Sequence, residues 1–175
     1  MLRELATSVL RFGVAPLPML AGWHALPLRL IIGLGFVEHG YAKISRGVDG
    51  FATILHAIGT PFADLLAWAT IAVEIGGGLL ILAGAFVPVA MVPMIVVLLV
   101  AIFTVHLPYG FSSIKLLSYD MSGAHFGQPG YETDLLYIAG LIALAAGGAG
   151  PFSVDGYLKD RMRRACNLGG TPDET

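Results

Sequence analysis

The sequence predicts an all-α fold, namely a transmembrane four-helix bundle with a short interfacial amphipathic helix after the first span. Of its 175 residues, 56% are hydrophobic and 13% are charged, whereas charged residues make up about 25% of an average soluble domain. Residues 65–105 contain a single ionisable side chain, Glu74. That stretch is long enough for two helical spans of about 20 residues each. Glycine supplies 23 residues, and small residues let membrane helices pack closely.

Four segments are predicted to cross the membrane. Three are residues 27–42, 63–86 and 89–107, and the fourth is residues 134–147, which could begin at 132 and run to 150. Prolines support these boundaries, because proline suits the first turn of a helix better than its interior. Pro27 begins the first segment, and Pro88 separates the second from the third. Pro93 lies inside the third segment, where we expect a bend.

Two connecting segments have distinctive patterns. Residues 47–59 carry Val48, Phe51, Leu55 and Ile58 at spacings of three and four, which predicts a short amphipathic helix lying on the membrane. The long loop of residues 108–133 is rich in aromatic side chains. We expect it to fold over the mouth of the bundle.

The chain divides into three predicted parts. Residues 1–26 are interrupted by charged and proline residues, and they lack the apolar run and small-residue cleavage site of a signal peptide. They are predicted to form an interfacial arm, with Trp23 at the depth of the lipid headgroups. Residues 27–158 are the four-helix transmembrane domain, and residues 159–175 form a basic and then polar cytoplasmic tail.

Four spans place both termini on the same side of the membrane. That side would carry seven basic residues, which are Arg3, Arg11, Arg29, Lys159, Arg161, Arg163 and Arg164. The opposite side would carry three, which are Lys43, Arg46 and Lys115. Because basic residues are enriched in cytoplasmic segments, both termini are predicted to be cytoplasmic.

Glu74 is the most informative polar residue in the sequence. Counted from Ala63, it lies roughly 16 Å along the second segment, near the middle of the membrane. A carboxylate at that depth costs a few kcal/mol and usually faces the protein interior with a partner. Glu74 therefore either stays protonated or pairs with His39, His106 or Lys43. A structural hydrogen bond and a role in ligand or proton handling are both compatible with the sequence.

Four other polar residues lie near the predicted outer ends of the spans, and they are His39, Lys43, His106 and Glu132. His39 and His106 could be functional or structural, whereas His24, His56 and His125 are predicted to be ordinary surface or interfacial residues. Arg29, Lys43 and Asp155 are predicted to anchor helix ends at the interface. The candidates for a ligand or proton site are Glu74, His39, His106, Lys43, Glu132 and Arg29, while Asp155 and Glu38 are predicted to be structural and no catalytic residue is assigned.

Several short motifs occur in a familiar order. They are Arg29-Leu30-x-x-Gly33, His39-Gly40-x-x-Lys43, Glu74-x-x-Gly77-Gly78, His106, Pro129-Gly130-Tyr131-Glu132, Leu135-Leu136-Tyr137 and Gly148-x-Gly150-x-x-Ser153-x-Asp155. In this order, over residues 26–158, the sequence resembles the DoxX family. The resemblance implies a small multi-pass protein of the bacterial or archaeal cytoplasmic membrane. It also implies an association with thiosulfate:quinone or thiol redox complexes.

Three functions compete at this point. The first is a membrane subunit of a quinone-linked oxidoreductase, in which His39 or His106 donates a hydrogen bond to a quinone and Glu74 passes protons. The second is haem or metal binding by His39 and His106, although neither lies in a metal-ligand spacing. The third is a non-enzymatic role as an accessory scaffold or a small transporter.

Composition limits the possible partners and cofactors. A net charge of −2 does not favour nucleic acid, so the expected partners are the lipid bilayer and either a redox protein or further copies of the chain. The single cysteine, Cys166, excludes an internal disulfide and a CxxC redox pair. The sequence has no flavin or dinucleotide fingerprint, so electrons would have to come from a partner or a bound cofactor.

Overall fold

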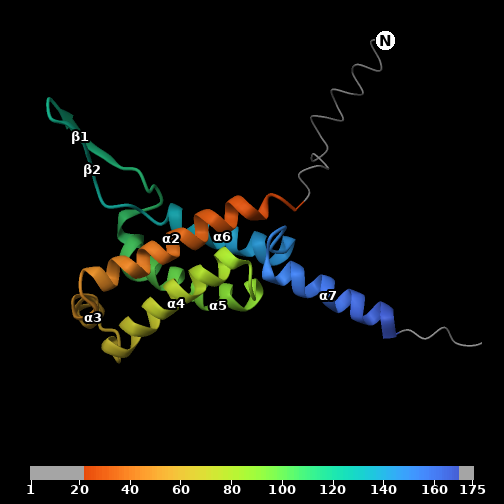
Figure 1. Ribbon diagram of the computed structural model, residues 1–175. Helices are drawn as coiled ribbons and strands as arrows, with labels where there is room; N and C mark the ends of the chain where they lie inside the picture. Colours follow the sequence, from red (N-terminus) through yellow and green to blue (C-terminus); the bar gives the residue numbers. More distant parts are fainter. Residues whose placement is uncertain (1–21, 170–175) are drawn as a thin grey trace, which may run out of the picture.

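The computed structural model describes residues 22–169, and these are mostly helical (Figure 1). The α-helices are α2 (Ala25–Ser45), α3 (Val48–Ala57), α4 (Ala63–Ala83), α5 (Val87–Ala101), α6 (Glu132–Gly147) and α7 (Val154–Gly169). A π-helical turn (Ile102–His106) and a 3₁₀ turn (Leu107–Tyr109) extend α5. Two antiparallel strands, β1 (Leu116–Asp120) and β2 (Gly123–Phe126), form a hairpin. The all-α prediction is therefore corrected by this small sheet.

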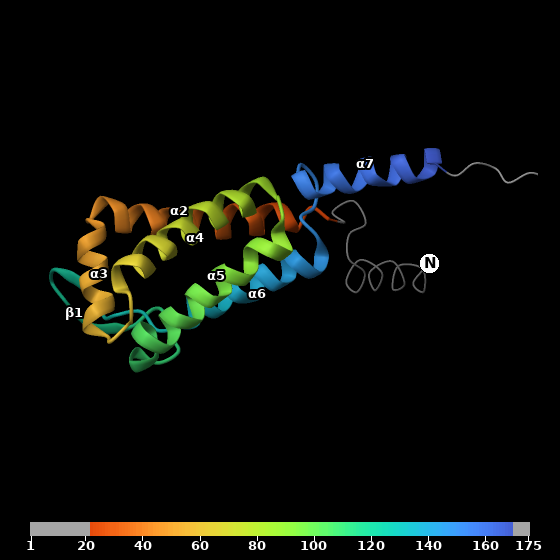
Figure 2. The ribbon, with the colours of Figure 1, turned by 90° about the horizontal axis from the view of Figure 1, so that it is seen from below.

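Four long helices, α2, α4, α5 and α6, pack side by side (Figure 2). Helix α4 contacts α2 and α5, and α6 closes the ring by contacting α5 and α2. Buried apolar side chains from all four helices and the loop after α6 fill the centre, and they are Ala25, Ile32, Phe36, Ile81, Val87, Ala90, Met94, Leu98, Leu141, Leu144 and Ala149. We call the two ends of this bundle the α3 end and the α7 end.

Two segments of the described chain, Ala63–Ala83 and Val87–Tyr109, are long and apolar enough to cross a membrane. Only 33% and 28% of their most apolar windows are buried within the protein, so most of their apolar surface faces outward. A soluble monomer rarely exposes such continuous apolar surface. The other two predicted spans do not pass the same test, because α2 carries several charged residues and α6 has only 16 residues.

Glycine residues bring α2 and α4 into close contact. A Cβ atom on Gly33 would lie 2.8 Å from the carbonyl oxygen of Gly78, and a Cβ on Gly78 would lie 2.8 Å from the carbonyl oxygen of Gly33. Further along the same seam, a Cβ on Gly40 would lie 2.6 Å from the Ile75 side chain. The two backbones can therefore touch only because these positions lack side chains.

Helix α3 occupies the position predicted for the amphipathic helix. Its buried residues Ala52 and Leu55 pack against Ala63 and Ala67 in the first turns of α4. Ile58, which belonged to the predicted apolar face, is 42% exposed and lies just past the helix end. Whether α3 lies in the membrane surface stays a prediction.

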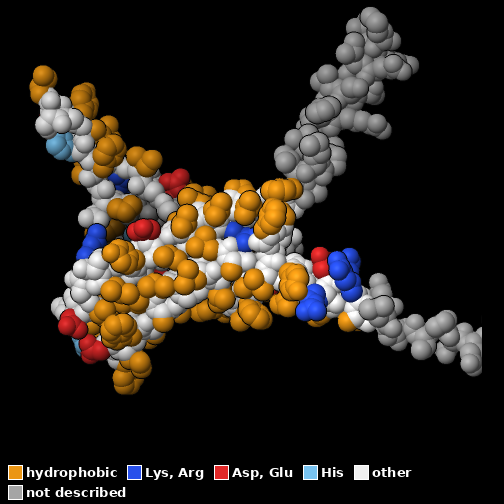
Figure 3. Space-filling view, viewed as in Figure 1, with side chains coloured by type: hydrophobic (Ala, Val, Ile, Leu, Met, Phe, Trp, Pro, Cys, Tyr) orange, Lys and Arg blue, Asp and Glu red, His pale blue; other side chains and the backbone are white. Residues whose placement is uncertain are grey.

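The predicted loop of residues 108–133 does not fold over the bundle. Its β1–β2 hairpin projects away from the helices near the α3 end (Figure 1), and every residue of both strands is exposed. Orange apolar side chains follow both the hairpin and the bundle surface (Figure 3). The aromatic side chains of the hairpin therefore lie on an exposed surface and do not cover the bundle.

The predicted tail is also more ordered than its composition indicates, because helix α7 begins at Val154 and continues to Gly169. Its basic residues project into the open at the α7 end (Figure 3). Most of the predicted N-terminal arm, residues 1–21, lies outside the described residues. Trp23 is 44% exposed and contacts the ring of Phe152 edge to face, with ring centroids 5.9 Å apart.

Candidate functional site

Glu74 and Lys43 form an ion pair between α4 and α2. The Lys43 Nζ lies 2.7 Å from both carboxylate oxygens of Glu74. The Glu74 side chain is 7% exposed and the Lys43 side chain 21% exposed, so the pair is largely shielded from solvent. The Lys43 ammonium also lies 5.1 Å from the centroid of the Phe51 ring in α3, a distance at which a cation is attracted to an aromatic face. Of the three partners open to Glu74, the structure selects Lys43.

Counting residues from Ala63 predicted that Glu74 lies near the middle of the membrane. In the structure, the Lys43–Glu74 pair lies closer to the α3 end of the bundle. Gly40 of α2 is level with Glu74, because a Cβ on Gly40 would lie 3.2 Å from the Glu74 Cβ. Gly40 is five residues from Ser45, where α2 ends, which corresponds to about 8 Å along the helix axis. The first turns of α4 extend beyond this level and pack against α3. Glu74 is therefore central in α4 but near the end of α2.

His106 lies at the end of the π-helical turn and contacts α6. Its Nδ1 lies 3.2 Å from the carbonyl oxygen of Pro129, and its Nε2 lies 3.9 Å from the Asp134 carboxylate. The side chains of His106 and Asp134 are 25% and 14% exposed. His39 of α2 is exposed, yet it is near enough to Asp134 for their charges to interact. Isolated π-helical turns within helices often occur at functional sites.

Sequence reasoning missed Asp134. It stands two residues after Glu132 at the start of α6, where acidic residues are common because they interact favourably with the helix dipole. The available signal was its spacing on the helix. Asp134 precedes Tyr137 and Leu141, which face α2 and the core, by three and seven residues, so all three share one face.

Glu132, which was a candidate, contacts the loop instead of the other ionisable residues. Its carboxylate accepts a hydrogen bond from the backbone N–H of Ser113 at 2.9 Å. The Ser113 hydroxyl in turn contacts Gly130 and Thr133, so this group fastens the loop to the start of α6. Glu38 is exposed.

Arg29, also a candidate, is at the opposite end of the bundle and has a structural role. Its side chain is buried and donates to five backbone carbonyl oxygens, which belong to Ile81, Leu82, Ala149, Pro151 and Phe152. Ile81 and Leu82 belong to the last turn of α4, where carbonyl groups have no partner within the helix. Arg29 is therefore not an interface anchor.

Asp155 lies beside Arg29 and completes this closure of the α7 end. Its carboxylate accepts hydrogen bonds from the backbone N–H groups of Phe86 at 2.7 Å and Val87 at 3.0 Å. These groups begin α5, so Asp155 caps that helix from a distant point in the sequence. It is also near enough to Arg29 for their charges to attract. The expectation of an interface anchor is corrected here too, and the predicted structural role fits this geometry.

We call Lys43, Glu74, His39, His106 and Asp134 the polar cluster. All five lie in the half of the bundle nearer the α3 end, and they come from α2, α4, α6 and the π-helical turn. Among residues 22–169, no three His, Cys, Asp or Glu side chains are grouped as metal ligands would be. The arrangement offers hydrogen-bond donors and two carboxylates, those of Glu74 and Asp134.

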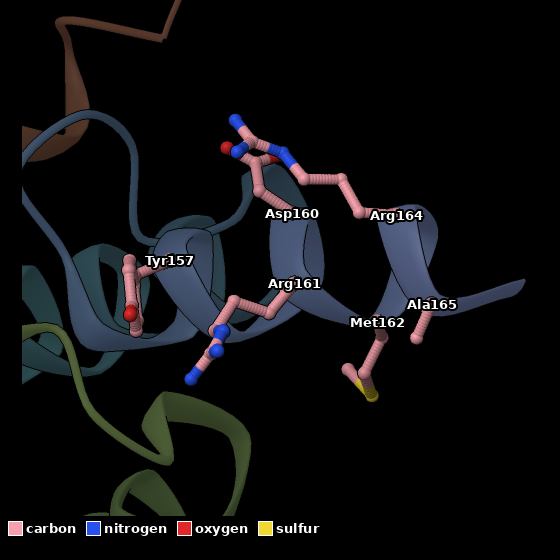
Figure 4. A pocket seen from close by; sticks show the side chains of 6 residues that line it. All are labelled: Tyr157, Asp160, Arg161, Met162, Arg164 and Ala165. Carbon is pink, nitrogen blue, oxygen red and sulfur yellow. The ribbon is translucent and has the colours of Figure 1, made fainter. Parts of the chain in front are cut away.

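A surface hollow elsewhere on the molecule does not coincide with the polar cluster. It has a volume of about 760 Å³ and runs along α7, lined by Tyr157, Asp160, Arg161, Met162, Arg164 and Ala165. Figure 4 shows Asp160 beside Arg164, and Arg161 beside Tyr157; the Arg161 guanidinium carbon is 5.8 Å from the centroid of that ring. Because these six residues belong to one exposed helix, the hollow is not an enclosed binding site.

The packed helices, their outward apolar surface and the shielded ion pair define a helical membrane protein. Residues 24–107 match the family model DoxX, which confirms the resemblance found in the sequence. This matched segment is DoxX-like, and it contains Arg29, His39, Lys43, Glu74 and His106. No curated protein and no solved structure matches the chain. The motifs around Glu132 and Asp155 lie beyond the matched segment.

Proposed function

We propose that the chain is the integral membrane subunit of a quinone-linked oxidoreductase that takes electrons from thiosulfate or a thiol. The observation that carries this proposal is the shielded Lys43–Glu74 pair, joined by His39, His106 and Asp134 at one end of the bundle. DoxX proteins are membrane proteins often linked to oxidoreductase functions. The polar cluster is the part of this chain that suits such chemistry.

The chemical groups in the cluster match what a quinone requires. A quinone has two carbonyl oxygens, each of which accepts hydrogen bonds, on an apolar ring. Lys43 offers ammonium donors, and His39 offers a ring N–H beside the same seam. Reduction to quinol consumes two protons, which Glu74 and the histidines can exchange. The buried pair also costs desolvation energy that a hydrophobic pair would not, so a role beyond packing explains it well.

We also propose that all four long helices cross the membrane. Two of the three charges in α2 do not oppose this, because Arg29 is bound to five carbonyl oxygens and Lys43 to Glu74. The third, Glu38, is exposed and lies about 10 Å from the end of the helix at Ser45. With 21 residues, α2 has a length of about 31 Å, enough to span the hydrocarbon core. The short α6 is followed by residues that pack onto Arg29. This arrangement fits a multi-pass protein of the cytoplasmic membrane.

The quinone proposal requires an electron donor, and we propose a soluble redox protein as that partner. The β1–β2 hairpin and its flanking residues support this idea, since they expose six large apolar side chains beside the polar cluster end, which are Ile114, Leu116, Leu117, Tyr119, Met121 and Phe126. An exposed apolar patch of this kind often marks an interaction site. Association between copies of the chain is the alternative use of this surface.

The test is a Glu74→Gln variant, studied in reconstituted membranes with a short-chain quinone. We expect quinone affinity to fall at least tenfold, about 1.4 kcal/mol, because the amide of this variant would neither carry a charge nor fix the Lys43 ammonium. Thermal unfolding is measured in parallel. Glu38→Gln is the matched control, since Glu38 is exposed on α2 and its replacement removes the same charge. That control should bind quinone like the unaltered protein.

A second variant separates binding from stability. Replacing both members of the pair, Lys43→Met with Glu74→Met, avoids leaving one charge unpaired, so stability should be kept or raised. If this double variant is stable and still binds quinone, the polar cluster is not the quinone site. If Glu74→Gln unfolds readily while quinone affinity is unchanged, the pair is a structural tie, and an accessory scaffold role is the better account.

A further inference from the structure

The described chain holds three contacts between a histidine and an aspartate, and they differ in exposure. The His56–Asp64 contact is 3.6 Å, with side chains 61% and 83% exposed. The His125–Asp120 contact is 3.1 Å, with side chains 51% and 60% exposed. The His106–Asp134 contact is 3.9 Å, but its side chains are only 25% and 14% exposed. Water screens the first two contacts strongly and the third much less.

The surroundings of His106 fix where its protons are. The Pro129 carbonyl oxygen can only accept a hydrogen bond, so the His106 Nδ1 at 3.2 Å carries a proton. The other ring nitrogen, Nε2, faces the Asp134 carboxylate. If neither Nε2 nor Asp134 held a proton, a lone pair would face a negative charge in a partly buried place. One proton shared by the two groups removes that repulsion.

His39 connects this contact to the Lys43–Glu74 pair. Its charge acts on Asp134 from α2, and it stands one helical turn before Lys43, where residues i and i+4 are neighbours. The polar cluster therefore contains two direct contacts, His106–Asp134 and Lys43–Glu74, and His39 lies on the same helix as Lys43 within range of the charge of Asp134. Nearby, Glu132 is held by Ser113, and Lys115 donates to the Tyr109 carbonyl, so both belong to the loop.

We propose that His106 and Asp134 form a proton-exchange site that serves the polar cluster. A proton from water binds the His106 Nε2 and gives an imidazolium. It then passes to the Asp134 carboxylate, which leaves His106 neutral and Asp134 protonated. The 3.9 Å gap exceeds a hydrogen bond, and a bridging water or a small rotation of the Asp134 side chain closes it. Delivery of this proton from Asp134 to a quinone bound at the polar cluster rests on the proposed function.

The experiment uses the full chain in vesicles with a short-chain quinone and a chemical reductant, and a pH-sensitive dye follows proton uptake. At saturating quinone, we expect Asp134→Asn and His106→Gln to slow uptake about tenfold or more, as the loss of a general acid or base does. Asp120→Asn is the matched control. Asp120 faces His125 on the exposed hairpin, and hydrogen bonds from the Ser122 hydroxyl and N–H hold its pKa below the ordinary value.

A second measurement does not depend on the quinone. Infrared difference spectra of the protein alone, taken between two pH values, report carboxyl groups that gain or lose a proton. We expect a carboxyl signal that Asp134→Asn removes, that His106→Gln alters, and that Asp120→Asn leaves in place. The proposal that His106 and Asp134 exchange protons is wrong if Asp134→Asn leaves the spectrum unchanged. It is also wrong if proton uptake is equally fast in all variants. A protein that keeps this signal but binds no quinone would instead refute the proposed function.

Discussion

At the scale of single residues, Arg29 shows how a buried charge can be satisfied by backbone carbonyl groups. A guanidinium has five N–H groups in a fixed planar fork, and Arg29 uses one on Ile81, two on Ala149 and Pro151, and two on Leu82 and Phe152. Its positive charge also lies at the C-terminal end of α4, where the helix dipole favours a cation. One side chain thus joins α2, the end of α4 and the loop after α6.

Arg29→Lys should therefore be far from conservative. Lysine has three donors, so at least two of the five carbonyl oxygens would lose their partner, and each unpaired buried group costs about 1–3 kcal/mol. We expect a loss of roughly 2–5 kcal/mol in the free energy of unfolding, measured by thermal or denaturant unfolding in detergent. Arg161→Lys on the exposed face of α7 is the control and should change stability by less than about 0.5 kcal/mol. Equal stability of both variants would contradict the bracing role of Arg29.

Residues of the site differ in how well the sequence could reveal them. Glu74 stood out because it is alone in a long apolar run, and a buried partner was expected on energetic grounds. The choice among Lys43, His39 and His106 depended on the crossing of α2 and α4, which hydropathy does not contain. Arg29 was misread because a charge near a helix end usually reaches the interface, and nothing local shows that five carbonyl oxygens surround it.

At the scale of elements, the α2–α4 contact should depend on single glycine positions. In Gly78→Ala the new methyl group would meet the Gly33 carbonyl oxygen at 2.8 Å and the Val37 side chain at 2.9 Å, so the helices must move apart. We expect Gly78→Ala to lower stability by about 1–3 kcal/mol through overpacking. The separation would also lengthen the Lys43–Glu74 contact, so quinone affinity should fall in the same variant.

Gly76→Ala is the matched control in the same helix. A Cβ on Gly76 would have no heavy atom within 4 Å, and alanine favours helix by up to about 1 kcal/mol relative to glycine. Gly76→Ala should therefore keep or raise the unfolding temperature. If both variants have the same stability, helix propensity determines the effect of these substitutions. The close contact between the glycines of α2 and α4 would then have no special role.

Elements were predicted well where hydropathy dominates and poorly where tertiary contacts decide. The start of α4 agrees with the predicted segment, α6 begins at the earlier of its two predicted starts, and α5 begins two residues early because Asp155 caps it. The hairpin was missed because aromatic residues in residues 108–133 were assigned to a lid. The alternation in Leu117–Tyr119 and the Ser122-Gly123 dipeptide, which is common at turns, were the available signals. The tail prediction for residues 159–175 used only the charges, although apolar residues of α7 recur at helical spacing.

At the scale of the whole molecule, the sequence is sufficient for the helical membrane class but not for the number of spans. Two segments are apolar enough to cross a membrane by themselves. The positions of α2 and α6 in the bundle depend instead on contacts with other parts of the fold. The number of basic residues that can be used to predict the orientation in the membrane changes as well. Arg29 and Lys43 are each bound within the bundle, so neither acts as a free loop charge. Lys159, Arg161, Arg163 and Arg164 on α7 still favour a cytoplasmic α7 end.

This orientation is testable because Cys166 is the chain's single cysteine and lies exposed on α7. A membrane-impermeant maleimide should label Cys166 in inside-out vesicles and not in intact cells. In a Cys166→Ser background, Ser118→Cys on the exposed hairpin should show the reverse pattern. Only α6 lies between the hairpin and α7. If α6 crosses the membrane, the two cysteines must therefore lie on opposite sides. Labelling of both cysteines from the same side would mean that α6 does not cross the membrane, and the polar cluster would then lie in a bundle of different topology.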